Sequence, residues 1–356
     1  MSTRRTFLKT MVAASAFFLP WTHWPKRWEA MLAAWAVEAK VHLTHHEPPL
    51  ANPTADSSLA AHPTAGSSSA AHAEIARDIA ALASPQCEGR KAGTAGEAKA
   101  AQYLMTEMQT LGLKPIHGAS YIQAFTLPPV TERRVGGRLT FQGDTAAVKG
   151  ELRAPSANLL GLLPGERGDE IMLLSAHYDH LGIFEGEGYP GANDNASGIA
   201  CVMQVLRRLL QAEVPRKRTL LVAFWSGEEM GFLGSKAFVQ NPPLPLADIK
   251  AVLNVDTIGN GQKGDFALWA HDTNAVVKAL QAAAKIQGAT APLVPYNGHN
   301  SDQISFAQVG IPAATLMARA WLENNHTVKD VPDFVNKDQI QLASEILFQA
   351  ILSLEH

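Results

Sequence analysis

The sequence predicts an α/β protein whose helices cover both faces of a central sheet. Two observations support this. After residue 153, apolar stretches of strand length alternate with amphipathic stretches of helix length, a pattern typical of strands joined by crossover helices. In addition, polar residues able to bind a metal follow four of the apolar stretches, as expected where strands end at the edge of such a sheet.

Apolar pattern and length place the individual elements. The expected strands are residues 171–176, 219–225, 251–255 and 312–317. The expected helices are residues 197–211, 274–286 and 337–353, and residues 91–112 form a loop followed by a helix ending at Gly112. Residues 120–153 alternate in polarity and contain proline and glycine, which indicates further strands and loops.

The N-terminal segment MSTRRTFLKTMVAASAFFLPW differs in character from the rest of the chain. Its paired arginines, Arg4 and Arg5, precede a short apolar stretch, and it resembles a twin-arginine export signal. The alternative is a chance basic N-terminus on a cytosolic protein. We expect a signal over residues 1–36 and hence a periplasmic or secreted protein. The apolar stretch is shorter than the ~20 residues of a membrane span, so no stable membrane anchor is expected.

Residues 37–74 are expected to form a low-complexity linker, and residues 75–356 the folded domain. The linker contains the related decapeptides ANPTADSSLA and AHPTAGSSSA, which lack the apolar periodicity of a core.

Composition narrows the class of protein. The chain has 356 residues, of which 46% are hydrophobic, and its formal net charge of -3 does not indicate a nucleic-acid partner. Its two cysteines, Cys87 and Cys201, can form one disulfide or remain free. The place of Cys201 on the apolar face of an expected helix favours free thiols.

The candidate ligands stand just after the strands, apart from one that precedes a helix. They are His177, Asp179 and His180 in AHYDHLG, Asp194 in GANDNASG, the adjacent Glu228 and Glu229, Asp256 in LNVDT, and His326 in NNHTVKD. Ligands of open α/β sheets bind at the carboxyl ends of strands, so residues this far apart in sequence can meet at one edge.

These residue types suit zinc or, less selectively, cobalt or manganese. A pair of ions needs a bridging carboxylate and terminal ligands on each ion. We expect His177 and Asp256 to hold one ion, Glu229 and His326 to hold the other, and Asp194 to bridge them.

The remaining residues of the set receive other roles. Glu228 is expected to face a metal-bound water and act as general base. Asp179 is expected to accept the second N–H of His177 and fix its tautomer, the alternative being a loop aspartate that caps a turn. His180 is interpreted as structural rather than as a ligand. Asp194 or Asn195 can alternatively cap the helix that follows.

Taken together, AHYDHLG, PGANDNASG, WSGEEMGFLGS, LNVDTIG and HTVKD resemble the motif series of the co-catalytic zinc aminopeptidases, metallopeptidase family twenty-eight. CEGRKAGTAGEAKAAQYL is similar to the N-terminal segment of that family, and the resemblance covers residues 75–352. It implies a three-layer α/β/α sandwich with a mixed, mostly parallel sheet, two zinc ions, and removal of N-terminal residues from peptides. Carried over by position, it gives the same roles: metal ligands His177, Asp194, Glu229, Asp256 and His326, base Glu228, and Asp179 beside a ligand.

The segment HNSDQISF departs from the family pattern, because Gln303 stands where histidine is frequent. The role of Asp302 therefore stays open. Some members use a tyrosine near this loop, or just before the final ligand, to polarise the substrate carbonyl. Asn325 stands before His326 here, so His299 takes that role or is a surface loop histidine.

The expected substrates are peptides with a free N-terminus. One alternative is a glutaminyl cyclase, which has a similar fold and a single zinc. The other is a non-catalytic binding domain that has kept the fold. The complete set of ligands and the base favours a peptidase over both.

Overall fold

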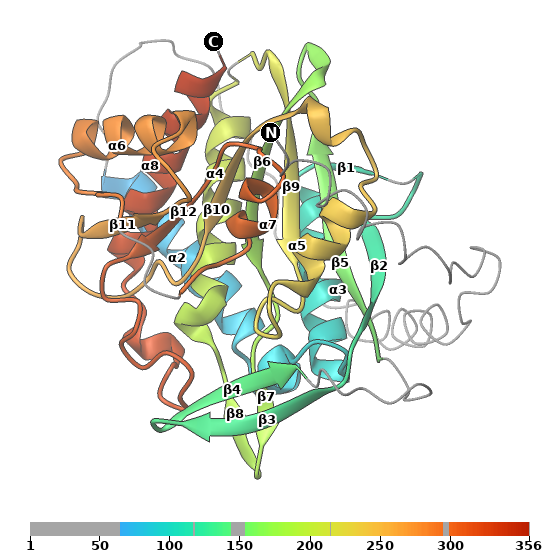
Figure 1. Cartoon of the computed structure of the whole chain (residues 1–356). Helices are drawn as coiled ribbons and strands as arrows, with labels where there is room; N and C mark the ends of the chain where they lie inside the picture. Colours follow the sequence, from blue (N-terminus) through green and yellow to red (C-terminus); the bar gives the residue numbers. More distant parts are fainter. Residues whose placement is uncertain (1–64, 117, 144–153, 214, 295–298, 356) are drawn as a thin grey trace, which may run out of the picture. The chain divides into compact units, whose positions relative to one another are not determined.

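The structure is a computed structural model that describes residues 65–356, apart from residues 117, 144–153, 214, 295–298 and 356 (Figure 1). The described residues all belong to one compact unit, Leu59–His356. The expected export signal and the expected linker up to residue 64 lie outside the described residues.

The unit is built on an eight-stranded mixed sheet with strand order β1-β5-β9-β6-β10-β12-β11, and β2 pairs with β5. Its four central strands, β9, β6, β10 and β12, run parallel, whereas β1, β2, β5 and β11 pair antiparallel at the sides. The strands are β1 Lys114–Pro115, β2 Ile122–Leu127, β5 Ala154–Leu163, β6 Arg167–His177, β9 Arg218–Trp225, β10 Ile249–Val255, β11 Phe266–Trp269 and β12 Ala313–Ala318. The mixed sheet predicted from the sequence is confirmed.

Helices cover both faces of this sheet (Figure 1). The larger core packs one face against five helices, which supply Ile75, Leu104, Met203, Leu280 and Leu347. They are α2 Ala65–Leu82, α3 Ala95–Thr110, α4 Gly198–Gln211, α6 Ala275–Ile286 and α8 Lys337–Leu354. A smaller core packs the other face against α5 Leu233–Gln240 and α7 Gln303–Ala307, through Phe238 and Phe306. The predicted three-layer arrangement is therefore present.

The central strands read as nearly continuous apolar runs because both of their faces are buried. Helix starts follow local capping chemistry: the side chain of Asn274 accepts the N–H groups of Val276 and Val277 at the start of α6. Each expected strand and helix after residue 153 is present, with ends shifted by at most four residues.

Helix α2 begins at Ala65, ten residues before the expected start of the folded domain. Ile75, Ile79 and Leu82 recur at spacings of three and four and are buried, so they anchor the C-terminal half of this helix. The alanine- and serine-rich residues that precede them continue the same helix, because alanine carries no side-chain entropy cost there.

Two hairpins lie together at one end of the unit (Figure 1). They are β3 Val130–Val135 with β4 Arg138–Gly143, and β7 Gly182–Phe184 with β8 Glu187–Tyr189. Leu139, Leu181 and Tyr189 form a buried cluster between them. The Arg134 guanidinium donates to the Glu187 carboxylate at 2.6 Å and strengthens this contact.

The remaining elements are short helical segments of three to six residues. They are η2 Pro85–Arg90, η3 Ala192–Ser197, η4 Leu246–Asp248 and η5 Pro332–Phe334. Cys87 and Cys201 are both buried free thiols, as their sequence context favours. Among the helices that the structure describes, none is both long and apolar enough to cross a membrane.

Candidate metal centre

All but one of the candidate ligands follow neighbouring strands that end at one edge of the sheet, and the exception, Asp194, lies in η3 before α4. His177 is the last residue of β6, and Asp256 directly follows β10. Glu228 and Glu229 follow β9 after a Ser-Gly turn, and His326 lies in the loop after β12. Because β9, β6, β10 and β12 are parallel neighbours, their carboxyl ends bring these side chains together.

Asp194 lies at the centre of the group and faces two histidines at once. Its Oδ1 atom is 3.3 Å from Nε2 of His177, and its Oδ2 atom is 3.2 Å from Nε2 of His326. The two oxygens of one carboxylate therefore point to ring nitrogens from separate loops. This is the arrangement that a carboxylate bridging two cations requires.

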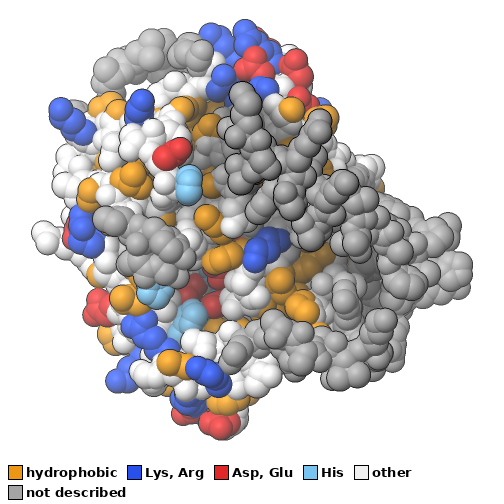
Figure 2. Space-filling model, viewed as in Figure 1, with side chains coloured by type: hydrophobic (Ala, Val, Ile, Leu, Met, Phe, Trp, Pro, Cys, Tyr) orange, Lys and Arg blue, Asp and Glu red, His pale blue; other side chains and the backbone are white. Residues whose placement is uncertain are grey.

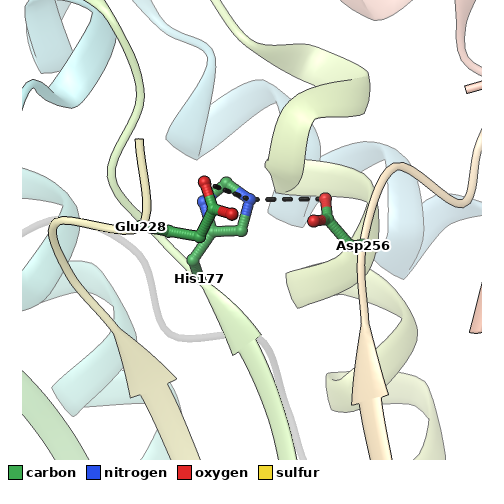
Figure 3. A group of neighbouring side chains, drawn as sticks. All are labelled: His177, Glu228 and Asp256. Carbon is green, nitrogen blue, oxygen red and sulfur yellow. Dashed lines mark hydrogen bonds and ion pairs between the residues drawn. The ribbon is translucent and has the colours of Figure 1, made fainter. Parts of the chain in front are cut away.

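Each histidine also faces at least one further carboxylate. Nε2 of His177 is 3.3 Å from Oδ1 of Asp256 and 4.0 Å from Oε2 of Glu228 (Figure 3). Nε2 of His326 is 3.0 Å from Oε2 of Glu229. All five residues predicted as ligands are thus brought together, in the pairs expected from the sequence.

The centre is largely shielded from water, and Figure 2 shows acidic and histidine side chains close together on the lower half of the face viewed. Burial alone would lower the pKa of His177, but Asp256 and Glu228 raise that pKa well above its usual value. Burial alone would also lower the pKa of His326. Glu229 and Asp194 favour its charged form and raise that pKa well above the usual value. Positive charge is therefore favoured at both ring positions.

The donor set fits zinc. It contains imidazole nitrogens and carboxylate oxygens only, and two groups of ligand atoms lie within 4.8 Å of one another: His177, Glu228 and Asp256 in one, His180, Asp194 and Glu229 in the other. Carboxylates outnumber the histidines, so the buried site carries excess negative charge, which bound cations would offset.

Glu228 and Glu229 have different electrostatic environments. Burial and then the neighbouring carboxylates Asp256 and Glu229 raise the pKa of Glu228 well above its usual value, although His177 opposes this. In contrast, His326 and His180 help to hold the pKa of Glu229 down at about 2 against the effect of burial. The pKa values of these two adjacent glutamates are thus shifted in opposite directions, a difference typical of paired acid and base groups.

Asp179 contacts both His177 and Glu228. Its Oδ1 atom is 3.7 Å from Nδ1 of His177 and accepts the backbone N–H of Glu228 at 3.1 Å. The backbone carbonyl of Asp179, at 3.3 Å, is closer to Nδ1 of His177 than the carboxylate is. Asp179 therefore connects the loops after β6 and β9.

His180, interpreted as structural from the sequence, lies inside the cluster. Its ring is fully buried, and Nδ1 is 2.7 Å from Oε1 of Glu229. The structure thus places His180 where it orients the Glu229 carboxylate, whose other oxygen faces His326.

His299 does not belong to either candidate metal group. Its ring stacks on the indole ring of Trp269, at 6.5 Å between centroids, and meets that of Trp321 edge-on at 4.8 Å. Asp302 is fully buried, and burial raises its pKa to about 7.

The loop that carries Asp194 is held by residues that sequence reasoning missed. Asp330 accepts the backbone N–H groups of Asn193 and Asp194 at 2.7 and 2.9 Å. The buried guanidinium of Arg90 donates to the carbonyls of Tyr178, Gly191 and Asp194. The side chain of Asn325 donates to Oδ2 of Asp194 at 2.6 Å. The only sequence signal was that Arg90 and Asp330 lie within the motif segments CEGRK and HTVKD.

Comparison with known proteins agrees with this arrangement. Residues 158–351 match the model of peptidase family M28. A probable leucine aminopeptidase of Arthroderma otae is 29% identical over 197 residues, which cover 51% of this chain and 52% of the relative. The chain spans about half the length of the curated relatives it matches.

Solved structures show the same fold. The zinc aminopeptidase BSAP of Bacillus subtilis has a TM-score of 0.64 at 19% identity, covering 80% of this chain and 95% of that one. A glutaminyl cyclase of Porphyromonas gingivalis has a TM-score of 0.60 at 17% identity, covering 81% and 98%. The fold alone therefore does not separate these two activities.

Proposed function

Because the chain belongs to peptidase family M28, we propose that it is a zinc-dependent aminopeptidase that removes N-terminal residues from peptides. The observation that carries the proposal is the position of Asp194, whose two oxygens face His177 and His326 at 3.3 and 3.2 Å. Each of these histidines also faces a further carboxylate, Asp256 for His177 and Glu229 for His326. A site for a single ion would not need this second set of ligands.

The proposed ligands divide into two sets around Asp194. His177 and Asp256 would hold one zinc ion, and Glu229 and His326 the other. Zinc bound here would supply Lewis acidity, which polarises the scissile carbonyl and lowers the pKa of water. The donor set leaves cobalt and manganese as possible substitutes.

In the proposed mechanism, a carboxylate oxygen of Glu228 takes a proton from the attacking water and passes it to the leaving amine. Asp179 holds the backbone N–H of Glu228 and so keeps the base beside the first ligand. The free α-amine of the substrate would lie against the carboxylates of the second ligand set.

A glutaminyl cyclase is the second candidate, because one is among the structural neighbours. Such an enzyme would cyclise N-terminal glutamine rather than cleave a peptide bond. The complete second ligand set of Glu229 and His326 favours the peptidase.

The test combines metal analysis of the purified protein with a panel of aminoacyl-nitroanilides, N-acetylated controls and glutaminyl peptides. We expect two zinc ions per chain, release only from substrates with a free amine, and no cyclisation. One zinc with cyclisation of glutaminyl peptides would identify the second candidate.

Glu228→Gln separates the base from the ligands. We expect this variant to keep the metal content of the wild type and to lose nearly all turnover, because the amide cannot accept the water proton. Hydrolysis at the wild-type rate would show that another group is the base.

We also propose export to the periplasm through the twin-arginine-type segment at the N-terminus. A folded metalloprotein would suit a route that carries proteins after folding. Replacement of Arg4 and Arg5 by lysine should leave the protein in the cytoplasm, and fractionation of the cells would measure this.

A further inference from the structure

The hairpin β3–β4 contacts the candidate ligand His326 through its backbone. Nδ1 of His326 is 2.9 Å from the carbonyl oxygen of Leu139, and the N–H of Leu139 donates to the carbonyl oxygen of His326 at 3.2 Å. This reciprocal pair joins residues 187 positions apart in the sequence. It also lies partly outside the segment 158–351 that matches the family model.

The geometry of the hairpin explains why Leu139 is available for this contact. Leu139 pairs with Arg134 across the hairpin. In an antiparallel pair, alternate residues direct both backbone groups away from the partner strand. Because the N–H and C=O of Leu139 both bond to His326, β4 presents its outer edge to the loop that carries this ligand.

Several contacts fix the hairpin in this position. The Leu139 side chain is fully buried between the two hairpins. The Arg138 guanidinium donates to the carbonyl oxygen of Leu322, in the same loop as His326, at 2.6 Å. Lys91 forms an ion pair with Glu132 on β3. The contact with His326 is therefore supported from both strands.

The bond to Leu139 decides which ring nitrogen of His326 faces the metal centre. Since a carbonyl oxygen only accepts, Nδ1 must carry a proton, and neutral His326 then has its lone pair on Nε2. That atom is 3.2 Å from Oδ2 of Asp194 and 3.0 Å from Oε2 of Glu229. The hairpin thus selects the tautomer that can bind a cation there.

We propose that the hairpin Val130–Gly143 is a positioning element of the metal centre, and that the backbone of Leu139 orients His326 for the ion it shares with Glu229. This inference rests on the proposed metal centre. It adds that a segment outside the matched family region determines whether the second ion binds.

The test compares two substitutions at one position. Leu139→Ala removes the buried side chain but keeps both backbone groups. Leu139→Pro also shortens the side chain, and in addition it removes the N–H that donates to His326. That N–H points away from β3, so the proline removes no bond of the hairpin itself.

Zinc affinity is measured for the apo proteins by competition with a chelator, and cobalt absorption spectra report the two sites separately. We expect Leu139→Ala to bind both ions within about threefold of the wild type. Leu139→Pro should lose ~10–100-fold in affinity for the second ion only, the range found when partners of ligating histidines are removed. Thermal unfolding of both apo proteins reports whether the fold is kept.

Equal affinities in the two variants and the wild type would overturn the inference while leaving the proposed function intact. A wild-type protein that binds fewer than two ions would instead contradict the proposed function.

If both Leu139 variants unfold, Arg138→Ala tests the same contact through the exposed anchor to Leu322. Its matched control is Val135→Ser at the 47% exposed tip of the hairpin, and equal affinity for the second ion in these two variants would also overturn the inference.

Discussion

At the scale of single residues, the charged groups that surround each carboxylate determine the direction of its pKa shift. Glu228 and Glu229 are neighbours, yet burial raises the pKa of the first while histidines lower the pKa of the second. The difference follows from direction: Glu229 faces His180 and His326, whereas Glu228 lies 4.0 Å from a single ring nitrogen of His177. The two residues are chemically identical, so the difference between their pKa values arises from the fold.

Asp330 should control metal affinity without being a ligand. Its two oxygens accept the N–H groups of Asn193 and Asp194, so an amide at this position would direct an NH₂ group at one of them. We expect Asp330→Asn to lower zinc affinity ~10–100-fold, as measured by chelator competition. Asp333→Asn, at an exposed position in the same segment, is the control. Equal affinities in the two variants would show that the loop does not need this support.

Glu97 should make stability depend on pH. Burial raises its pKa from 4.5 to about 7, although Ser156 and Ser226 donate to it and oppose the shift. Between these two pH values the folded protein holds a proton that the unfolded chain has lost, so this contribution is present at low pH and lost as pH rises. Glu97→Gln lacks the titration. Relative to this variant, the wild type should lose up to about 3 kcal/mol of unfolding free energy between pH 4.5 and pH 7.5.

Denaturant unfolding of both proteins across this pH range measures the effect. Groups common to both proteins cancel in the difference. A difference that stays constant with pH would mean that folding does not raise the pKa of Glu97.

At the scale of elements, helix α2 is fixed to the rest of the domain by buried charge. Asp78 is fully buried and accepts hydrogen bonds from Arg207 on α4 at 2.8 Å and from Tyr103 on α3 at 2.6 Å. Three helices therefore meet at one carboxylate. Removing it leaves the Arg207 guanidinium, itself mostly buried, without this partner.

We expect Asp78→Ala to lower the free energy of unfolding by ~3–5 kcal/mol, the cost of breaking a buried ion pair from one side. Lys99→Ala is the control, because the Lys99–Glu88 pair is exposed on both sides and should contribute no more than ~1 kcal/mol. Denaturant unfolding compares the two variants. A loss as small as that of the control would mean that α2 is held by its apolar residues alone.

Most elements could be predicted from the sequence because the apolar runs are long and their ends are marked. Helix α6, for example, begins directly after the capping residue Asn274. The start of α2 could not be predicted in the same way. Its first turns contain alanine and serine, which do not distinguish a helix from a linker without knowledge of what the following residues contact.

At the scale of the whole molecule, the candidate centre joins loops from four parallel strands. That the five candidate ligands lie together could be predicted, because each stands near a strand end or helix start within a motif. The residues around them could not: Arg90, Leu139 and Asp330 act on the centre largely through backbone atoms across 104 to 187 positions of sequence. A single sequence does not show which residues such backbone contacts join.

Removal of the metal should therefore lower the stability of the loops at this edge of the sheet. We expect a chelator to abolish activity and to lower the thermal midpoint, because cations that bind only the folded state stabilise it. Readdition of zinc should restore both. Unchanged unfolding after complete removal of metal would show that the loops are held without it.

The effect of zinc should also grow as pH rises. Protons compete for the ring nitrogens, since neighbouring carboxylates raise the pKa of His177 and His326 in the metal-free protein. Protonated histidines stabilise the metal-free protein at low pH, and this contribution is lost as pH rises through their raised pKa values. Zinc affinity should consequently increase from pH 6 to pH 8, and an affinity independent of pH would contradict this electrostatic picture.

Anomalous diffraction at the zinc edge from crystals of the purified protein tests the central claim most directly. Two peaks should lie on either side of the Asp194 carboxylate, one against His177 and Asp256 and the other against Glu229 and His326. A single peak, or peaks away from Asp194, would contradict the assignment of a two-ion centre.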